Sequence, residues 1–171
     1  MSETHDGGSD FDDAFRDFLP RAVRVAYRIL GDVDDAEDAA VEALARAAVR
    51  WRRVGALDYR EAWVLRVTAN VAVDVARRRR RSLPAAALVE PVQPTHEDLV
   101  VLQLALATAL AKLSRRQREV VTLRYLAGMT DVDVARCLHV SIGTVKRHGG
   151  RALEGLRAQL GADWEVAQDA G

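Results

Sequence analysis

Cysteine is almost missing from this chain: Cys137 is the only one among 171 residues. A lone cysteine excludes an internal disulfide, and a chain without disulfides fits a reducing compartment. In an apolar helical stretch, such a residue is more often a small buried filler than a reactive thiol. We therefore expect Cys137 to be structural.

Long apolar runs are missing too. No stretch approaches the roughly 18 apolar residues that would span a membrane. The acidic, polar N-terminus also lacks the basic region and apolar run of a signal peptide. The sequence therefore predicts a cytoplasmic protein without membrane insertion.

Signs of catalysis or metal binding are also absent. The four histidines have no zinc-site spacing. The acidic run 32–38 lacks the glycine at its sixth place and the glutamate at its twelfth that a calcium loop needs. The chain contains no nucleophile elbow or phosphate-binding loop. We expect no enzyme activity, no cofactor and no metal.

Net charge is zero, with 25 cations against 25 acids, but the charges are segregated along the chain. Acids gather in residues 6–17 and 32–42, whereas residues 77–81 are an unbroken cationic run. Residues 99–160 hold ten cations and four acids, a net charge of +6. This last part is therefore expected to bind a polyanion.

Helical periodicity is what the chain does have. Apolar residues recur at helical spacing over residues 11–30, and Gly31 is a left-handed stop. Pro20 either kinks this helix or starts a second one. A further helix is predicted over 34–51, opened by the capping box Asp-Asp-Ala-Glu, and another over 59–81. No strand-like alternation and no internal repeat is found, so the predicted fold class is all-α.

A proline-rich stretch divides the chain. Residues 82–98 hold three of the four prolines and no cation, which predicts an extended linker between helical domains at 1–81 and 99–160. Fully stretched, the linker reaches roughly 55–60 Å at about 3.4 Å per residue. The domains are therefore separable by more than one turn of DNA, about 34 Å. Residues 161–171 are predicted to be an unstructured tail.

The C-terminal domain reads as a helix-turn-helix. Ser114, with Gln117 three residues on, can cap one helix; Thr130 can cap the next and Ser141 the last. A four-residue turn opened by His139 joins the last two helices. A helix of this width fits the major groove of duplex DNA, and cations on its free face suit phosphates and guanine edges. The last helix carries Lys146, Arg147, His148 and Arg151.

The predicted helix 59–81 has two faces. Valines at 64, 67, 71 and 75 repeat at three or four residues and are expected to lie in the core. Polar residues repeat likewise on another side: Arg66, Asn70, Asp74, Arg77 and Arg81.

These segments resemble a known family, the bacterial sigma factors of the sigma-70 class in their short, two-domain extracytoplasmic-function form. Tyr27-Arg-Ile-Leu-Gly-Asp-Val-Asp-Asp-Ala-Glu-Asp and Ala62-Trp-Val-Leu-Arg-Val-Thr-Ala-Asn-Val-Ala-Val-Asp look like region 2 of that family. Arg116-Gln-Arg-Glu-Val-Val-Thr-Leu-Arg-Tyr and Gly143-Thr-Val-Lys-Arg with Arg151-Ala-Leu are similar to region 4. The resemblance covers nearly the whole chain.

The resemblance implies three partners. Region 2 of such proteins binds core RNA polymerase and melts the minus-10 promoter element, while region 4 reads the minus-35 element as duplex and contacts the polymerase flap. Because two helical domains on a flexible linker are easily clamped shut, an anti-sigma factor is a further candidate partner. Val41 stands where the family commonly has glutamine. The polymerase-binding residues would be Asp35, Glu37, Asp38 and Glu42.

Two sets of DNA-binding residues are implied. For the minus-35 duplex they are Ser141, Thr144, Lys146, Arg147, Gly150 and Arg151. Among these, Arg147 and Arg151 suit bidentate contacts with guanine and Lys146 suits a phosphate. Melting needs phosphate contacts and a pocket for an unstacked base, and loop 52–58 beside Tyr59 is the candidate pocket. The minus-10 set is Arg52, Arg53, Trp63, Arg66, Asn70, Asp74 and Arg77. Trp63 also fits a role as a core anchor.

Two further features depart from the family pattern. Gly149 and Gly150 lie inside the last helix, where each glycine costs about 1 kcal/mol relative to alanine. The helix is expected either to fray there or to approach DNA closely. His139 stands where a helix-turn-helix usually has a left-handed glycine, and histidine tolerates that backbone better than most residues.

Two other functions compete with this interpretation. A dimeric helix-turn-helix regulator would use residues 99–160 without polymerase, but it leaves the Asn70 face and the run 77–81 without a role. Such a regulator would bind promoter duplex by itself and retard it in a gel mobility-shift assay. A protein-binding adaptor would require that charge reversal of Arg147 and Arg151 leave function intact.

Overall fold

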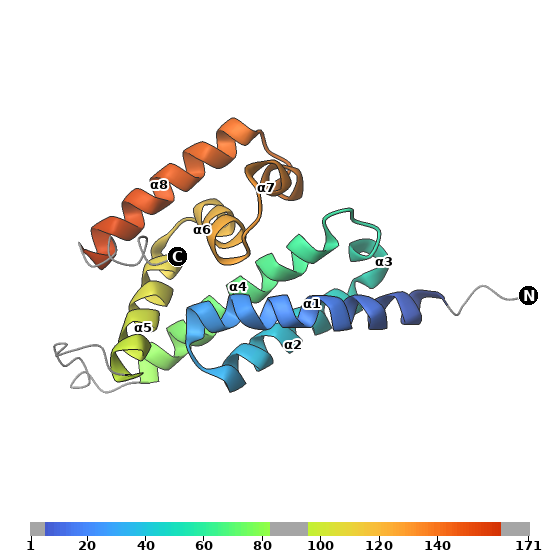
Figure 1. Ribbon diagram of the computed structural model, residues 1–171, viewed down its shortest axis with the longest axis horizontal. Helices are drawn as coiled ribbons and strands as arrows, with labels where there is room; N and C mark the ends of the chain where they lie inside the picture. Colours follow the sequence, from blue (N-terminus) through green and yellow to red (C-terminus); the bar gives the residue numbers. More distant parts are fainter. Residues whose placement is uncertain (1–5, 83–95, 162–171) are drawn as a thin grey trace, which may run out of the picture.

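Three long helices that bury many alanines form the first half of the molecule. The computed structural model describes residues 6–82 and 96–161, and every regular element in these two ranges is helical, which confirms the all-α prediction. The bundle consists of α1 (Asp6–Leu30), α2 (Val33–Val49) and α4 (Arg60–Ser82), with the single turn α3 (Trp51–Val54) between the last two (Figure 1). Alanine has the highest helix propensity, and its small side chain lets helices approach closely. The alanines buried in this bundle include Ala22, Ala26, Ala36, Ala40, Ala43, Ala47, Ala69 and Ala72.

Pro20 does not start a second helix. Helix α1 is a single element through the proline, and Gly31 follows it with a φ of +69° as the expected left-handed stop. The N-cap of α2 differs from the prediction. Its cap is Asp32, whose carboxylate accepts a hydrogen bond from the amide of Asp35 at 2.9 Å, so Asp34 lies inside the first turn and does not open the helix.

Two other boundaries were also wrong. The segment 52–58, predicted as a loop, begins with a helical turn, because its first three residues belong to α3. The chain then turns toward α4. The predicted linker is shorter at its C-terminal side, where helix α5 begins at His96 and not at Leu99. The remainder of the linker after Ser82, together with the tail after Gly161, lies outside the described residues.

The second half contains the helix-turn-helix. Each predicted cap is present: Ser114 forms a full capping box with Gln117, and the hydroxyls of Thr130 and Ser141 accept from the amides three residues on. His139 has a φ of +53° and ends α7 in the left-handed conformation, as expected. The turn has three residues, 139–141, and not four. The elements are α5 (His96–Lys112), α6 (Arg115–Val121), η2 (Thr122–Leu126), α7 (Asp131–Leu138) and α8 (Ile142–Leu160).

A π-helical turn, η2, extends α6. In it the amide of Ala127 donates to the carbonyl of Thr122 at 2.9 Å, five residues back. No signal in the sequence predicted this turn. At the end of this turn, the carbonyl of Leu126 accepts a hydrogen bond from Arg28 of α1, and the carbonyl of Ala127 accepts one from Arg21.

The two halves pack against each other. Helix α5 lies against α4 and α1 on one side and against α8 on the other, while η2 and α7 face α4. In Figure 1, α6 and α7 lie between α4 and the outer helix α8. The buried apolar residues of both halves form one continuous cluster. The two helical bodies, which the sequence predicted to be separable by the length of the linker, are therefore in contact in this structure.

The turn between α1 and α2 is one place where α5 presses closely. A Cβ atom on Gly31 would lie 1.4 Å from Oε1 of Gln103 in α5, so a side chain there would push the end of this flexible side chain aside, while the φ of +69° by itself favours glycine. Gly128 has the same φ of +69° but nothing within 4 Å of the corresponding position.

Replacing Gly31 by alanine should therefore destabilise the protein more than replacing Gly128. Both substitutions place alanine in a left-handed conformation, which costs about 1–2 kcal/mol. Only the first also displaces the side-chain amide of Gln103, and we expect a further small loss, below about 1 kcal/mol, because this flexible side chain can move. Urea unfolding followed by circular dichroism measures both free energies. Equal losses would contradict the close packing of α5 on this turn.

Candidate nucleic-acid interface

Helix α8 carries an exposed cationic face. Lys146, Arg147 and Arg151 are all exposed, whereas Val145 and Ala152 on the opposite side are buried. The alternation follows the helical repeat, so one stripe anchors α8 and the other is free to meet a ligand. This is the face that the sequence predicted for the minus-35 set, and its residues are now seen together on one helix.

The other three members of that set lie at the N-cap, in the first turn and in the middle of α8. Gly150 is exposed with no atom within 4 Å of a Cβ position. The Ser141 hydroxyl accepts from the amide of Thr144 at 3.1 Å, and the two hydroxyls share a further hydrogen bond at 3.0 Å. Ser141 therefore positions the helix end, where backbone amides face outward and favour an anion.

Gly149 serves packing. The helix is unbroken through both glycines, so the expectation of fraying was wrong. Gly149 is buried, and a Cβ on it would lie 2.8 Å from a terminal nitrogen of Arg124. Arg124 in turn forms an ion pair with Asp131 at 2.6 Å, at the start of α7. The absent side chain lets this arginine pass across α8 and tie η2 to α7.

The minus-10 set is spread along one side of the first half. Arg52, Arg53, Asp74 and Arg77 are exposed, while Trp63 and Asn70 are half-buried. Arg66 has only 19% of its side chain exposed. Half-burial of Trp63 suits both the anchoring role and the binding role that the sequence left open.

A cavity of about 320 Å³ lies beside this set. Arg53, Trp63 and Arg66 line it, and the other four members of the predicted set do not. Val54, Leu57 and Tyr59, from the predicted pocket loop 52–58 and its neighbour, line it too. Arg50, Cys137 and His139 were missed from the sequence, the last two because they come from a distant segment. Three guanidinium groups and two aromatic rings suit phosphates and a stacked base.

The acidic residues of α2 form a separate surface. Glu37, Asp38 and Glu42 are exposed, and Val41, also exposed, lies among them. Asp35 differs from the others, because its carboxylate forms an ion pair with Arg79 of another helix, α4, whereas Glu42 pairs with Arg46 on α2 itself. We call Glu37, Asp38, Val41 and Glu42 the α2 face.

Cys137 fits the structural role expected of it. It is 2% exposed, and burial raises the pKa of its thiol, although the nearby charge of Arg66 opposes this. A raised pKa keeps the thiol protonated and unreactive at neutral pH. Among residues 6–82 and 96–161, no group of three or more His, Cys, Asp or Glu side chains could hold a metal ion. None of the helices in these ranges is long and apolar enough to cross a bilayer.

Comparison with known proteins gives matches for both halves. Residues 14–82 match the sequence model of the family described as sigma-70 region 2, and residues 109–158 match that of sigma-70 region 4. Among individual proteins, the chain is 31% identical to the RNA polymerase sigma-E factor of Streptomyces coelicolor, over 88% of this chain and 86% of that protein. It is 33% identical to the ECF RNA polymerase sigma factor SigM of Mycobacterium tuberculosis, over 88% and 77%.

A solved structure is similar as well. The sigma factor RpoE of Bartonella quintana, determined in complex with the anti-sigma factor NepR, is 26% identical to this chain. The alignment covers 90% of this chain and 98% of that one, with a TM-score of 0.50. The likeness therefore extends over both helical bodies.

The two adjacent glycines of α8 should respond differently to alanine. Gly150→Ala gains helix propensity without meeting any atom, so its free energy of unfolding should rise by up to about 1 kcal/mol. Gly149→Ala should gain less or lose, since its Cβ meets Arg124 while Asp131 holds that arginine in place. Thermal and urea unfolding of the two variants test this. An equal gain from both would show that Gly149 has no packing role.

Proposed function

This chain belongs to the sigma-70 family of RNA polymerase sigma factors, in its extracytoplasmic-function (ECF) type, and we propose that it binds core RNA polymerase and directs it to start transcription at specific promoters. The observation that carries the proposal is the exposed cationic face of a capped helix-turn-helix. A cavity lined by three arginines, most of whose walls come from the first helical body, supports a division of labour between duplex reading and strand opening.

Helix α8 reads the minus-35 element in the major groove. Arg147 and Arg151 lie one helical turn apart and suit bidentate contacts with guanine, while Lys146 suits a phosphate. The amides at the capped N-terminus of α8 add a phosphate contact beside Ser141 and Thr144. The open surface at Gly150 lets the DNA backbone come close to the helix.

The first body opens the minus-10 element. Arg53 and Arg66 neutralise phosphates at the cavity, and the rings of Tyr59 and Trp63 receive a base that has left the stack. Asn70 offers both a donor and an acceptor to a base edge. Three exposed residues extend this surface along the displaced strand. They are Arg52 on α3, and Asp74 and Arg77 on α4.

The α2 face binds the polymerase. Its three carboxylates and one exposed valine combine charge with an apolar contact, which is a common composition for a protein interface. Asp35 contributes indirectly, because its ion pair with Arg79 holds α2 against α4. An anti-sigma factor is a further partner that we propose from the resemblance to the Bartonella complex.

Run-off transcription tests the function. Purified core enzyme, with and without the chain, is incubated with fragments of the source genome, and the transcript starts are mapped by sequencing. Discrete starts should depend on both components. Absence of any chain-dependent start would overturn the proposal. A sequence-specific shift of duplex by the chain alone would instead favour a regulator that works without polymerase.

Arg147→Ala should relax base preference at one minus-35 position. Loss of a bidentate contact removes about 1–3 kcal/mol of discrimination at that position and leaves the others unchanged. Transcription from a randomised minus-35 library measures the preference. Arg157→Ala is the matched control, because Arg157 is exposed on the last turn of the same helix. Unaltered selectivity in the Arg147 variant would count against this role.

Asn70→Ala should impair strand opening more than polymerase binding. The side chain is proposed to contact a base only after melting, so the variant should assemble with core enzyme normally and show weaker permanganate reactivity at minus-10 thymines. Glu37→Lys is the reciprocal control, since reversal of charge on the α2 face should weaken assembly first. If both variants lost assembly equally, the assignment of Asn70 to melting would fail.

A further inference from the structure

A small cavity between helix α1 and the end of η2 has no part in the proposed function. Its volume is about 220 Å³, and it shares no lining residue with the cavity assigned to the minus-10 base. Of the described residues that line it, three are arginines and none is an acid. We call it the α1 cavity, and its main lining residues are Arg21, Arg24, Arg28, Leu126, Ala127 and Gly128. A hollow lined by cations alone is a candidate site for an anion.

The three arginines form a stripe on one side of α1. They follow one another at spacings of three and four residues, which places them on one helix face. The opposite face, with Ala22 and Ala26, is buried in the bundle. Like charges at this spacing destabilise a helix. An anion that meets the whole stripe would remove this repulsion.

Two of the three guanidinium groups are held by the end of η2. Arg28 donates to the carbonyl of Leu126 at 2.5 Å, and Arg21 donates to that of Ala127 at 3.2 Å. These hydrogen bonds cover two carbonyl oxygens that would otherwise repel an anion. A guanidinium group has five N–H donors, so Arg28 keeps further donors for a ligand.

Arg24 differs from its two neighbours on the stripe. It is exposed, and within residues 6–82 and 96–161 no hydrogen bond or ion pair engages it. Arg21, by contrast, also pairs with Glu61 at 2.6 Å. All the donors of Arg24 are therefore available, and its charge is not neutralised by a described carboxylate.

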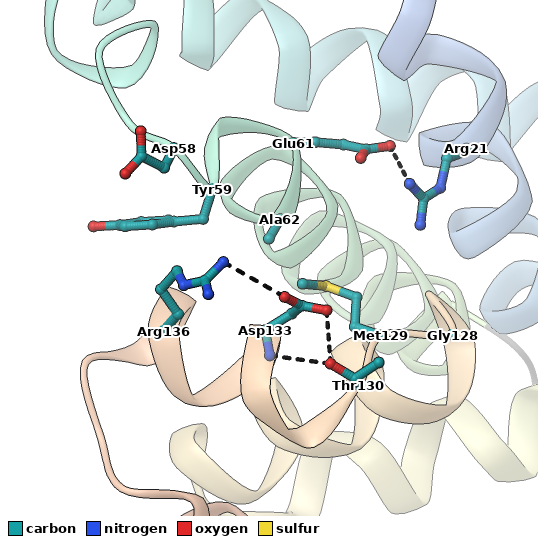
Figure 2. A pocket seen from close by; sticks show the side chains of 10 residues that line it. All are labelled: Arg21, Asp58, Tyr59, Glu61, Ala62, Gly128, Met129, Thr130, Asp133 and Arg136. Carbon is teal, nitrogen blue, oxygen red and sulfur yellow. Dashed lines mark hydrogen bonds and ion pairs between the residues drawn. The ribbon is translucent and has the colours of Figure 1, made fainter.

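The neighbouring cavity has the opposite character. It has a volume of about 260 Å³ and also borders Arg21 and Gly128, but three carboxylates line it. Figure 2 shows these carboxylates: Asp58 and Glu61 lie near the start of α4, Asp133 lies on α7, and Arg21 is turned toward Glu61. An anion is therefore favoured in the α1 cavity and disfavoured next to it.

The size of the α1 cavity limits its ligand. It is smaller than the roughly 300–1,000 Å³ of pockets that enclose a drug-sized molecule. Nothing lies within 4 Å of a Cβ position on Gly128, so the cavity is open on this side. A small anionic group can therefore enter while the rest of its molecule extends into solvent. A continuous nucleic-acid strand would instead need a groove that tracks its backbone.

A diphosphate group suits the chemistry of the lining. The planar guanidinium fork matches phosphate oxygens, and several negative charges on one ligand can meet several cations at once. The apolar side chains of Val25 and Leu126 also line the cavity. They lower the local dielectric constant, which strengthens the contacts between guanidinium and phosphate.

We propose that the α1 cavity binds a small phosphorylated compound, with a diphosphate group between Arg24 and Arg28 beside the end of η2. Residues of both helical bodies line the cavity, so one bound molecule would contact both. The chain would then respond to the concentration of such a compound. The inference does not depend on the proposed function, because neither the α8 face nor the minus-10 cavity takes part in it.

Isothermal titration calorimetry of the full chain with inorganic pyrophosphate tests the site. Arg24→Ala removes an exposed side chain that makes no polar contact with the described residues, so its fold should be kept. We expect this variant to bind about tenfold more weakly or worse, the effect of one lost charge-assisted hydrogen bond. Arg24→Lys keeps the charge without the planar fork, and its affinity should lie between those of the parent and the alanine variant.

Arg16→Ala is the matched control for charge. Arg16 is an exposed arginine of the same helix that pairs with Asp13 and does not line the cavity, so its variant should bind as the parent does. Parent-like affinity of Arg24→Ala, or an equal loss in Arg16→Ala, would overturn the site. Sulfate that bound as tightly as pyrophosphate at equal ionic strength would overturn the assignment to a diphosphate.

Two further probes separate the possible sources of phosphate. ADP carries a diphosphate group on a small molecule, so it should compete with pyrophosphate and lose affinity in Arg24→Ala. A fluorescein-labelled, 20-nucleotide mixed-sequence single strand should bind Arg24→Ala and Arg16→Ala equally well by fluorescence anisotropy. If the strand alone responded to Arg24→Ala, the cavity would belong to a DNA path and the proposal of a small ligand would fall.

Thermal unfolding gives an independent measurement. A ligand that binds only the folded chain raises Tm, and for a chain of this size pyrophosphate at about 100 times its Kd should raise the parent Tm by about 5 °C or more. The rise in Arg24→Ala at the same concentration should be much smaller. Sulfate at equal ionic strength corrects for the general effect of salt. Equal corrected rises in the parent and in Arg24→Ala would contradict binding at this cavity.

Discussion

Close approach of helices through alanine is the constraint on which this molecule depends. The inner side of α2 is almost entirely alanine, and the buried sides of α1 and α4 hold mostly alanine and valine, with Ile29 and Leu65 as larger members. Such small side chains leave little room for adjustment, so the three axes are held close together. Arginines and carboxylates, whose charges are costly to bury without partners, lie outside this core. The bundle thus separates a tightly packed interior from the charged surfaces that carry the function.

Local signals made the second half predictable from sequence. Serine and threonine caps, a left-handed histidine and the cationic stripe each act within a few residues, so α6, α7 and α8 could be placed from their own composition. The cap of α2 was misplaced by two residues because several aspartates compete there, and only geometry shows that Asp32 meets the free amide. The π-helical turn has no local signature at all.

Contacts between distant segments account for what the sequence could not reveal in the candidate site. The recognition-helix residues were identified together because they share one helix. The cavity was only partly anticipated, because Tyr59 and His139 are 80 positions apart and nothing in either segment indicates the other. The same holds for Arg66 and Glu119, and for Arg79, which takes Asp35 away from the α2 face. Ion pairs between distant helices form only when the helices pack, so they cannot be inferred from either segment alone.

The bare surface of α8 at Gly150 has an evolutionary consequence. Because nothing in the protein approaches that position, a side chain could be added there without rearranging a neighbour, and it would point toward the surface that we assign to duplex reading. Descendants of this chain could therefore acquire a new base preference by a single codon change while keeping the same scaffold. Gly149, one residue away, is constrained by Arg124 and offers no such freedom.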